Sequence, residues 1–114
     1  MDKWQEKLAV YDKLISANPN FERKGKAMPY TSANGHMFSQ LNKDGELGIR
    51  LSKESGEKFM EKYQTPPFKA YGAVMKEYVL VPEELYDDLE LLASFLDESY
   101  NYVMSLKPKA TKKK

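Results

Sequence analysis

The stretch that decides the fold runs from residue 34 to residue 51 and reads NGHMFSQLNKDGELGIRL. It opens with Asn34-Gly35, a pair that tolerates positive φ and is a strong signal for a β-hairpin. A second turn signal follows at residues 42–45, where Asn, Lys, Asp and Gly stand together. From there to Leu51, apolar residues alternate with polar or small ones, as on a strand with one apolar face. The stretch therefore predicts an antiparallel meander packed on helices through one face.

Elements on both sides of this meander are predicted from spacing and from helix-breaking residues. Apolar side chains recur every three or four residues over 2–17 and again after Pro82, which is typical of amphipathic helices. Ser52 is a favourable N-cap for the helix between the two groups of strands. The expected elements are a helix at 2–17, strands at 26–31, 36–42 and 46–51, a helix from the Ser52 cap to about 64, strands at 68–71 and 74–81, and a helical segment at 82–106.

This order predicts an α+β, two-layer fold: an antiparallel sheet of about five strands with helices packed on it, in the order α-β-β-β-α-β-β-α. The last helical segment is expected either as one long helix or as a short turn followed by a longer helix. The 114 residues suit one domain, which we place at residues 1–106. The Lys-rich residues 107–114 are expected to form a disordered tail.

The net charge of +1 hides a strong segregation along the chain. Residues 1–76 carry +4, residues 77–106 carry −8 with no Lys or Arg, and residues 107–114 carry +5. No apolar run approaches the roughly 20 residues of a membrane span, and the charged amino terminus lacks the apolar core of a signal peptide. We therefore expect a soluble, cytoplasmic protein without membrane contact.

The residues that usually carry catalysis are scattered. There is no cysteine, and His36 is the single histidine, so thiolate zinc sites and cysteine nucleophiles are excluded. The serines show no nucleophile elbow or triad spacing, and the glycines form no phosphate-binding loop. Acidic residues at 83–90 suit the amino end of a helix better than a metal site. The sequence predicts a protein that is not an enzyme and binds no cofactor or metal.

Apolar residues on the second face of the sheet predict a partner interface. A two-layer fold leaves one sheet face open, and exposed aromatic residues there often mark protein contacts. Phe38, Tyr78 and Leu80 are expected on that face. A protein partner or a second copy of the chain fits this interpretation. A helix covering the face is the alternative, and the sequence alone does not separate the two.

Two basic segments predict a second candidate function, nucleic-acid binding. Lysine and arginine supply sequence-independent affinity for phosphate, and a nearby strand aromatic offers a stacking surface. The acidic segment would repel nucleic acid on its own face. In the alternative interpretation, the tail only keeps the chain soluble or neutralises that segment. The candidate contacts are Arg23, Lys24 and Lys26, where the chain enters the first strand, and Lys107, Lys109, Lys112, Lys113 and Lys114 in the tail.

Five segments together resemble the N-terminal domain of the TfoX/Sxy-type regulators of natural competence, in a short, single-domain form. They are KGKAMPY at 24–30, NGHMF at 34–38, LGIRL at 47–51, KEYVLVP at 76–82 and SYNYVMSLKPK at 99–109. The resemblance implies an α+β domain without enzymatic activity. It also implies a regulatory role in expression of DNA-uptake genes, in cooperation with a cyclic-AMP-dependent transcription activator. By this resemblance the chain is a non-enzymatic regulatory or adaptor module that acts through protein–protein contact.

Overall fold

The computed structural model describes residues 3–17, 23–25, 29–70 and 73–107. The elements within these residues alternate between helices and strands in the predicted order. They are α1 (Lys3–Ser16), β1 (Tyr30–Ala33), β2 (His36–Leu41), β3 (Leu47–Arg50), α2 (Lys53–Tyr63), β4 (Pro67–Ala70), β5 (Ala73–Leu80), the 3₁₀ helix η1 (Glu83–Asp87) and α3 (Leu89–Ser105).

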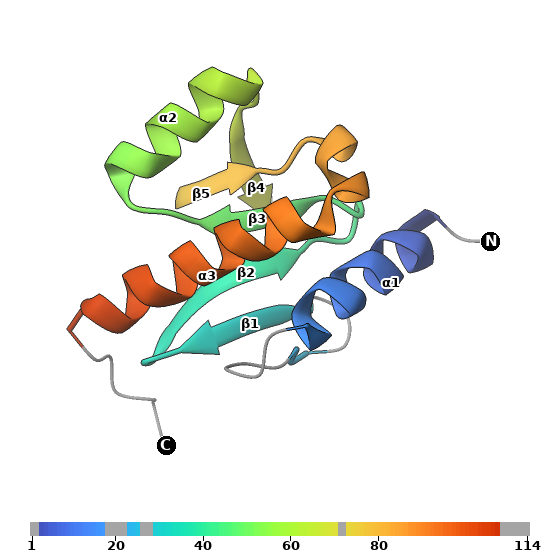
Figure 1. The fold of residues 1–114 in the computed structure, drawn as a ribbon, viewed down its shortest axis with the longest axis horizontal. Helices are drawn as coiled ribbons and strands as arrows, with labels where there is room; N and C mark the ends of the chain where they lie inside the picture. Colours follow the sequence, from blue (N-terminus) through green and yellow to red (C-terminus); the bar gives the residue numbers. More distant parts are fainter. Residues whose placement is uncertain (1–2, 18–22, 26–28, 71–72, 108–114) are drawn as a thin grey trace.

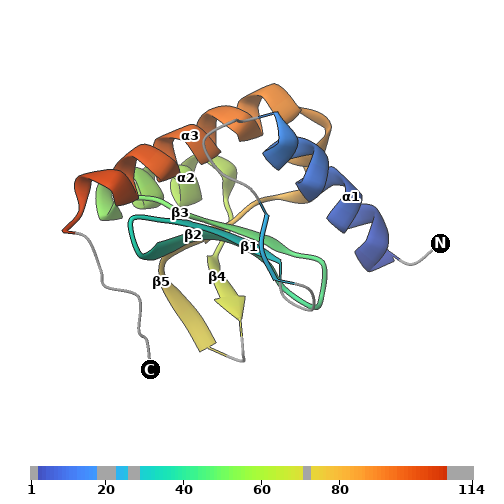
Figure 2. The same cartoon turned by 90° about the horizontal axis from the view of Figure 1, so that it is seen from below.

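The strands form one antiparallel sheet in the order β1-β2-β3-β5-β4. The three α-helices lie on one side of this sheet, and the β4–β5 hairpin bends away on the other side (Figure 1, Figure 2). A single bridge between Lys24 and Tyr30 adds a sixth, one-residue segment to the predicted five strands. The predicted fold class, a two-layer α+β fold with helices on an antiparallel sheet, is confirmed.

The predicted hairpin turn and one of the two forms expected for the last helical segment are present. Asn34 and Gly35 both have positive φ, 57° and 80°, as the hairpin between β1 and β2 requires. The last helical segment is split into η1 and α3, which is the second of the two expected forms. Asp88 begins α3 by accepting a hydrogen bond from the Leu91 N–H at 3.1 Å. The first strand begins at Tyr30, four residues later than expected, and residues 26–28 lie outside the described residues.

A β-bulge in β2 turns Phe38 toward the helices. The ladder pairs Thr31 with Ser39 but Ser32 with Met37, so Phe38 is an extra residue between two consecutive pairs of the β1–β2 ladder. An extra residue reverses the alternation of side chains along the strand. Phe38 is therefore fully buried. Its ring packs edge to face against the ring of Tyr100 on α3, with 6.0 Å between the two ring centroids. The expectation that Phe38 lies on an open sheet face is wrong.

The core lies between the sheet and the helices. The hydroxyl of Ser99, on α3, is within hydrogen-bonding distance of the carbonyl oxygens of Phe38, at 3.1 Å, and of Arg50. This small residue lets α3 approach the bulge closely and satisfies polar atoms there. The largest fully buried side chains on this side are Tyr11, Leu14, Phe38, Leu41, Ile49, Leu51, Val79, Leu92, Leu96 and Val103.

The hairpin covers part of the opposite sheet face. Phe68 of β4 is fully buried there and packs against Tyr78, with 6.1 Å between the ring centroids. Its ring also lies directly on Gly48 of β3. A Cβ atom at position 48 would come within 2.3 Å of the Phe68 ring, so a residue with a side chain would force the ring to move. Met37, Met75 and Leu80 pack around this second, smaller cluster.

Among the described residues, no helix has the length and apolar character needed to span a membrane.

We predict that Gly48→Ala destabilises the protein by about 1–3 kcal/mol, because the added methyl group overpacks the contact with Phe68. Chemical denaturation monitored by circular dichroism measures this change. In the double variant Gly48→Ala/Phe68→Leu, the smaller side chain makes room for the methyl group. The double variant should therefore lose less stability than the sum of the two single variants. Simple additivity would contradict the contact.

Candidate functional site

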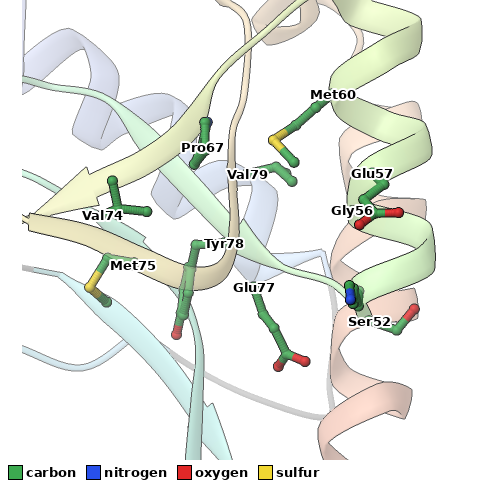
Figure 3. Close-up of a pocket in the computed structure, with 11 residues that line it drawn as sticks. Ser52, Gly56, Glu57, Met60, Pro67, Val74, Met75, Glu77, Tyr78 and Val79 are labelled. Atoms are coloured by element: carbon green, nitrogen blue, oxygen red, sulfur yellow. The ribbon is translucent and has the colours of Figure 1, made fainter.

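The candidate site is a groove between α2 and the β4–β5 hairpin, with a volume of about 430 Å³, which we call the α2–hairpin groove. Figure 3 shows α2 along one wall and the two strands along the other. Most of the lining side chains are apolar, and three are charged. The apolar ones include Met60, Pro67, Val74, Met75 and Val79, and the charged ones are Lys53, Glu57 and Glu77.

Local sequence features place α2 beside the hairpin. The Ser52 hydroxyl accepts a hydrogen bond from the Ser55 N–H at 3.2 Å and so begins the helix. Gln64 ends it in the left-handed conformation, at φ 53°. Gly56 is buried on the side that meets β5, where a Cβ atom would lie 3.6 Å from the Val79 Cγ1. The missing side chain at position 56 leaves space between helix and strand.

The groove carries exposed apolar surface. Val74 exposes 57% of its surface. Within the part of the chain that the structure describes, only one other large apolar side chain is exposed, Met104 on α3 with 47%. Val74 lines the groove together with the half-buried Met60 and Met75, so its exposed surface continues into the groove.

A charged cluster lies at Glu77, which also lines the groove. Arg50 approaches the Glu77 Oε1 with Nε at 2.9 Å and Nη2 at 2.8 Å. The Tyr102 hydroxyl donates to the Oε2 at 2.8 Å. Burial, and then this hydrogen bond, raise the pKa of Tyr102, which keeps its hydroxyl protonated as a donor. Both carboxylate oxygens are thus engaged by groups of β3 and α3.

The structure separates Phe38 from the other two residues of the predicted partner interface, Tyr78 and Leu80. Phe38 lies in the main core, as described above. Tyr78 is 6% exposed, and its hydroxyl donates to the Met37 carbonyl at 2.7 Å. Burial raises the pKa of Tyr78, which keeps the hydroxyl protonated for this bond. Leu80 is half-buried and packs against the same small cluster. Only Leu80 keeps appreciable accessible surface, so whether it meets a partner stays a prediction.

The described residues of the two basic segments, Arg23 and Lys24 on one side and Lys107 on the other, lie at opposite ends of β1. Arg23 pairs with Asp12 of α1 at 2.6 Å and donates to the Gly25 carbonyl at 3.0 Å, so its guanidinium is engaged within the chain. Lys24 is exposed and its backbone pairs with Tyr30, the first residue of β1. At the other end of the β1–β2 hairpin, the Nε2 of His36 is 2.9 Å from the Lys107 carbonyl oxygen.

The described residues therefore do not form one continuous basic patch. The other candidate contacts lie outside the described residues; they are Lys26, Lys109, Lys112, Lys113 and Lys114. Within the described ranges, no group of three or more His, Asp or Glu side chains is arranged to hold a metal ion.

No protein-family model matches this chain, and no curated protein matches its sequence.

Sequence reasoning missed the α2–hairpin groove, although two signals pointed to it. Gly56 interrupts an otherwise helical pattern, and an isolated glycine in a helix often has a packing reason. Val74-Met75 places two apolar residues next to the hairpin turn. The groove itself depends on the path of β5 near Glu77, where φ is +70°. Glutamate rarely adopts a positive φ, so the sequence gives no indication of this backbone conformation at position 77.

We predict that Gly56→Ala stabilises the protein by about 0.5–1 kcal/mol, the usual gain from removing a glycine inside a helix. The new methyl group would meet Val79 at ordinary van der Waals distance. Urea denaturation gives the change, and Gly48→Ala serves as the matched control with the opposite expected sign. Destabilisation by Gly56→Ala would mean that α2 and β5 lie closer than described.

Proposed function

We propose that the chain is a non-enzymatic protein-interaction module that acts in a regulatory setting in the cytoplasm. In this proposal the α2–hairpin groove is the contact surface, and its occupant is an apolar side chain or short segment of a partner protein or of a second copy. The observation that carries the proposal is the exposed Val74, which adds accessible apolar surface to an apolar groove. Exposed apolar surface continuous with a groove is typical of protein-interaction sites.

The lining of the groove supports contact rather than catalysis. Glu77 already accepts from Arg50 and Tyr102 through both carboxylate oxygens, and the Ser52 hydroxyl already caps α2. A catalytic site needs a nucleophile or an acid–base pair with a convergent oxyanion or metal partner. The remaining charged lining residues, Lys53 and Glu57, are exposed on α2. They suit the polar margin of an apolar contact.

The resemblance to the N-terminal domain of TfoX/Sxy-type regulators supports the regulatory part of the proposal. By that resemblance, the module would act in transcription regulation of DNA-uptake genes, through contact with another regulator. Fold and family resemblance do not define a contact surface. The choice of the groove therefore depends on Val74 and its neighbours alone.

Photo-crosslinking tests the surface. A benzophenone amino acid is placed at position 74 in one variant and at position 104 in another, and each is expressed in the cells of origin. Val74 and Met104 are matched, since both are exposed apolar residues and lie on different elements. We expect a discrete covalent adduct from position 74 and none from position 104. An adduct at twice the mass of the chain indicates a second copy, and any other mass indicates a different partner.

Competition makes the result specific. Excess unlabelled wild-type protein or Met104→Glu should suppress the adduct at position 74, whereas Val74→Glu should not, because a carboxylate would be buried in the apolar contact. Equal adducts at both positions, or suppression by Val74→Glu, would contradict the proposed surface. DNA binding that falls steeply with salt, and is lost when the chain is cut after Leu106, would favour the nucleic-acid function instead.

A further inference from the structure

Glu77 adopts a backbone conformation that is unusual for its residue type. Its φ of +70° lies in the left-handed region, which favours glycine. Of the three non-glycine residues with positive φ in the described part of the chain, Asn34 and Gln64 occupy a hairpin turn and a helix end. Glu77 lies inside a strand, where neither a turn nor a cap accounts for it. Surrounding contacts must hold such a conformation in place.

The ladder between the hairpin strands is irregular at this point. Pro67 pairs with Val79, whereas Lys69 pairs with Val74, so residues 75–78 of β5 lie opposite Phe68 alone. Such an irregularity bends the strand and removes regular pairing. The part of β5 that carries Val74 and Met75 is therefore joined to the sheet through a bulged segment that contains Glu77.

Contacts from two other elements hold this bulged segment. The Glu77 carbonyl accepts from the Leu51 N–H at 2.9 Å, which continues the pairing with β3. The Glu77 carboxylate binds Arg50 of β3 through one oxygen and Tyr102 of α3 through the other. The side chains of Arg50 and Glu77 are only 22% and 20% exposed. Charge-assisted hydrogen bonds with limited solvent access are stronger than exposed ones.

The groove has walls on both sides of the bulge. Val74 and Met75 precede the bend in the chain and lie on the hairpin arm, whereas Val79 follows it and pairs with β3. Gly56 and Met60 of α2 form the facing wall. Figure 3 shows Glu77 at the base of the hairpin arm that carries Val74 and Met75. A change in the direction of β5 at Glu77 would move these two residues relative to α2 and change the width of the groove.

We propose that the Arg50–Glu77–Tyr102 cluster is a conformational lock that fixes the bend of β5 and thereby sets the width of the α2–hairpin groove. Release of Glu77 lets the hairpin arm move while the main core stays folded. Glu77 is a positioning residue in this scheme, since it acts through Val74 and Met75. The role of the lock in partner binding rests on the proposed function. Whether the cluster fixes the bend of β5 is independent of that function, because it can be measured on the free protein.

Amide hydrogen exchange measured by NMR tests the lock. In Glu77→Ala we expect the amides of residues 73–75 to exchange about tenfold faster, the effect expected from losing a charge-assisted hydrogen bond. The amides of β2 and β3 should stay within about twofold of wild type. Tyr102→Phe removes the hydrogen bond to one Glu77 oxygen and leaves the contact with Arg50 in place. It should therefore give a smaller increase in the exchange rate at the same residues. Glu54→Gln, which removes an exposed carboxylate 3.8 Å from Lys58, is the matched control without effect.

Two further results decide between the lock and its alternatives. Glu77→Gly also removes the carboxylate but suits the positive φ, so it should accelerate exchange at residues 73–75 as Glu77→Ala does. Protection retained in Glu77→Gly would mean that backbone conformation alone sets the bend, and would overturn the proposal. Equal acceleration at all sites would also overturn it, because Glu77 would then support global stability only. If the Glu77 variants do not fold, Tyr102→Phe provides the test. Faster exchange confined to residues 73–75 supports the lock, and unchanged exchange at these residues contradicts it.

Discussion

The ring of Phe68 rests on the backbone of Gly48, and the arrangement of the second sheet face depends on this contact. Complete burial of a phenylalanine side chain contributes about 1.5–3 kcal/mol, which is large beside the stability of a small domain. The contact requires β4 to fold across β3, and Asn42 holds it there by donating to the Lys69 carbonyl at 3.1 Å. The hairpin therefore shields part of the sheet face that the helices leave uncovered. As a result, accessible apolar surface lies in the α2–hairpin groove rather than on the sheet face under the hairpin.

Two irregular points in the strands redirect the side chains. The bulge at Phe38 turns an aromatic ring into the main core, and Ser99 accommodates it from α3. The bulge at Glu77 bends β5 so that Val74 and Met75 line the groove beside α2. A strained backbone residue costs about 1–3 kcal/mol, and charge-assisted hydrogen bonds of about 1.5–3 kcal/mol each are sufficient to offset it. The shape of the groove thus depends on the balance, at Glu77, between backbone strain and the hydrogen bonds that offset it.

The sequence was sufficient to predict the fold but not the site. Signals that act within a few residues, such as Asn34-Gly35 and the Ser52 cap, gave the elements and their order, and the structure confirms them. The predicted interface assumed strict alternation along β2, and the bulge at Phe38 breaks that alternation. Bulges and positive φ at a glutamate arise from packing between distant segments, here α3 and β3, which no local pattern reports. Gly48 illustrates the same limit, because its role depends on Phe68, twenty positions later.

Solution NMR tests the closed second face most directly. If Phe68 lies on Gly48, the two α-protons of Gly48 show nuclear Overhauser contacts to the Phe68 ring protons and strong upfield ring-current shifts. Gly56, which lies on α2 away from that ring, provides the internal comparison and should show neither. If the Gly48 α-protons show ordinary shifts and no contact to Phe68, the hairpin does not cover the sheet. The sheet face, rather than the α2–hairpin groove, would then be the accessible apolar surface.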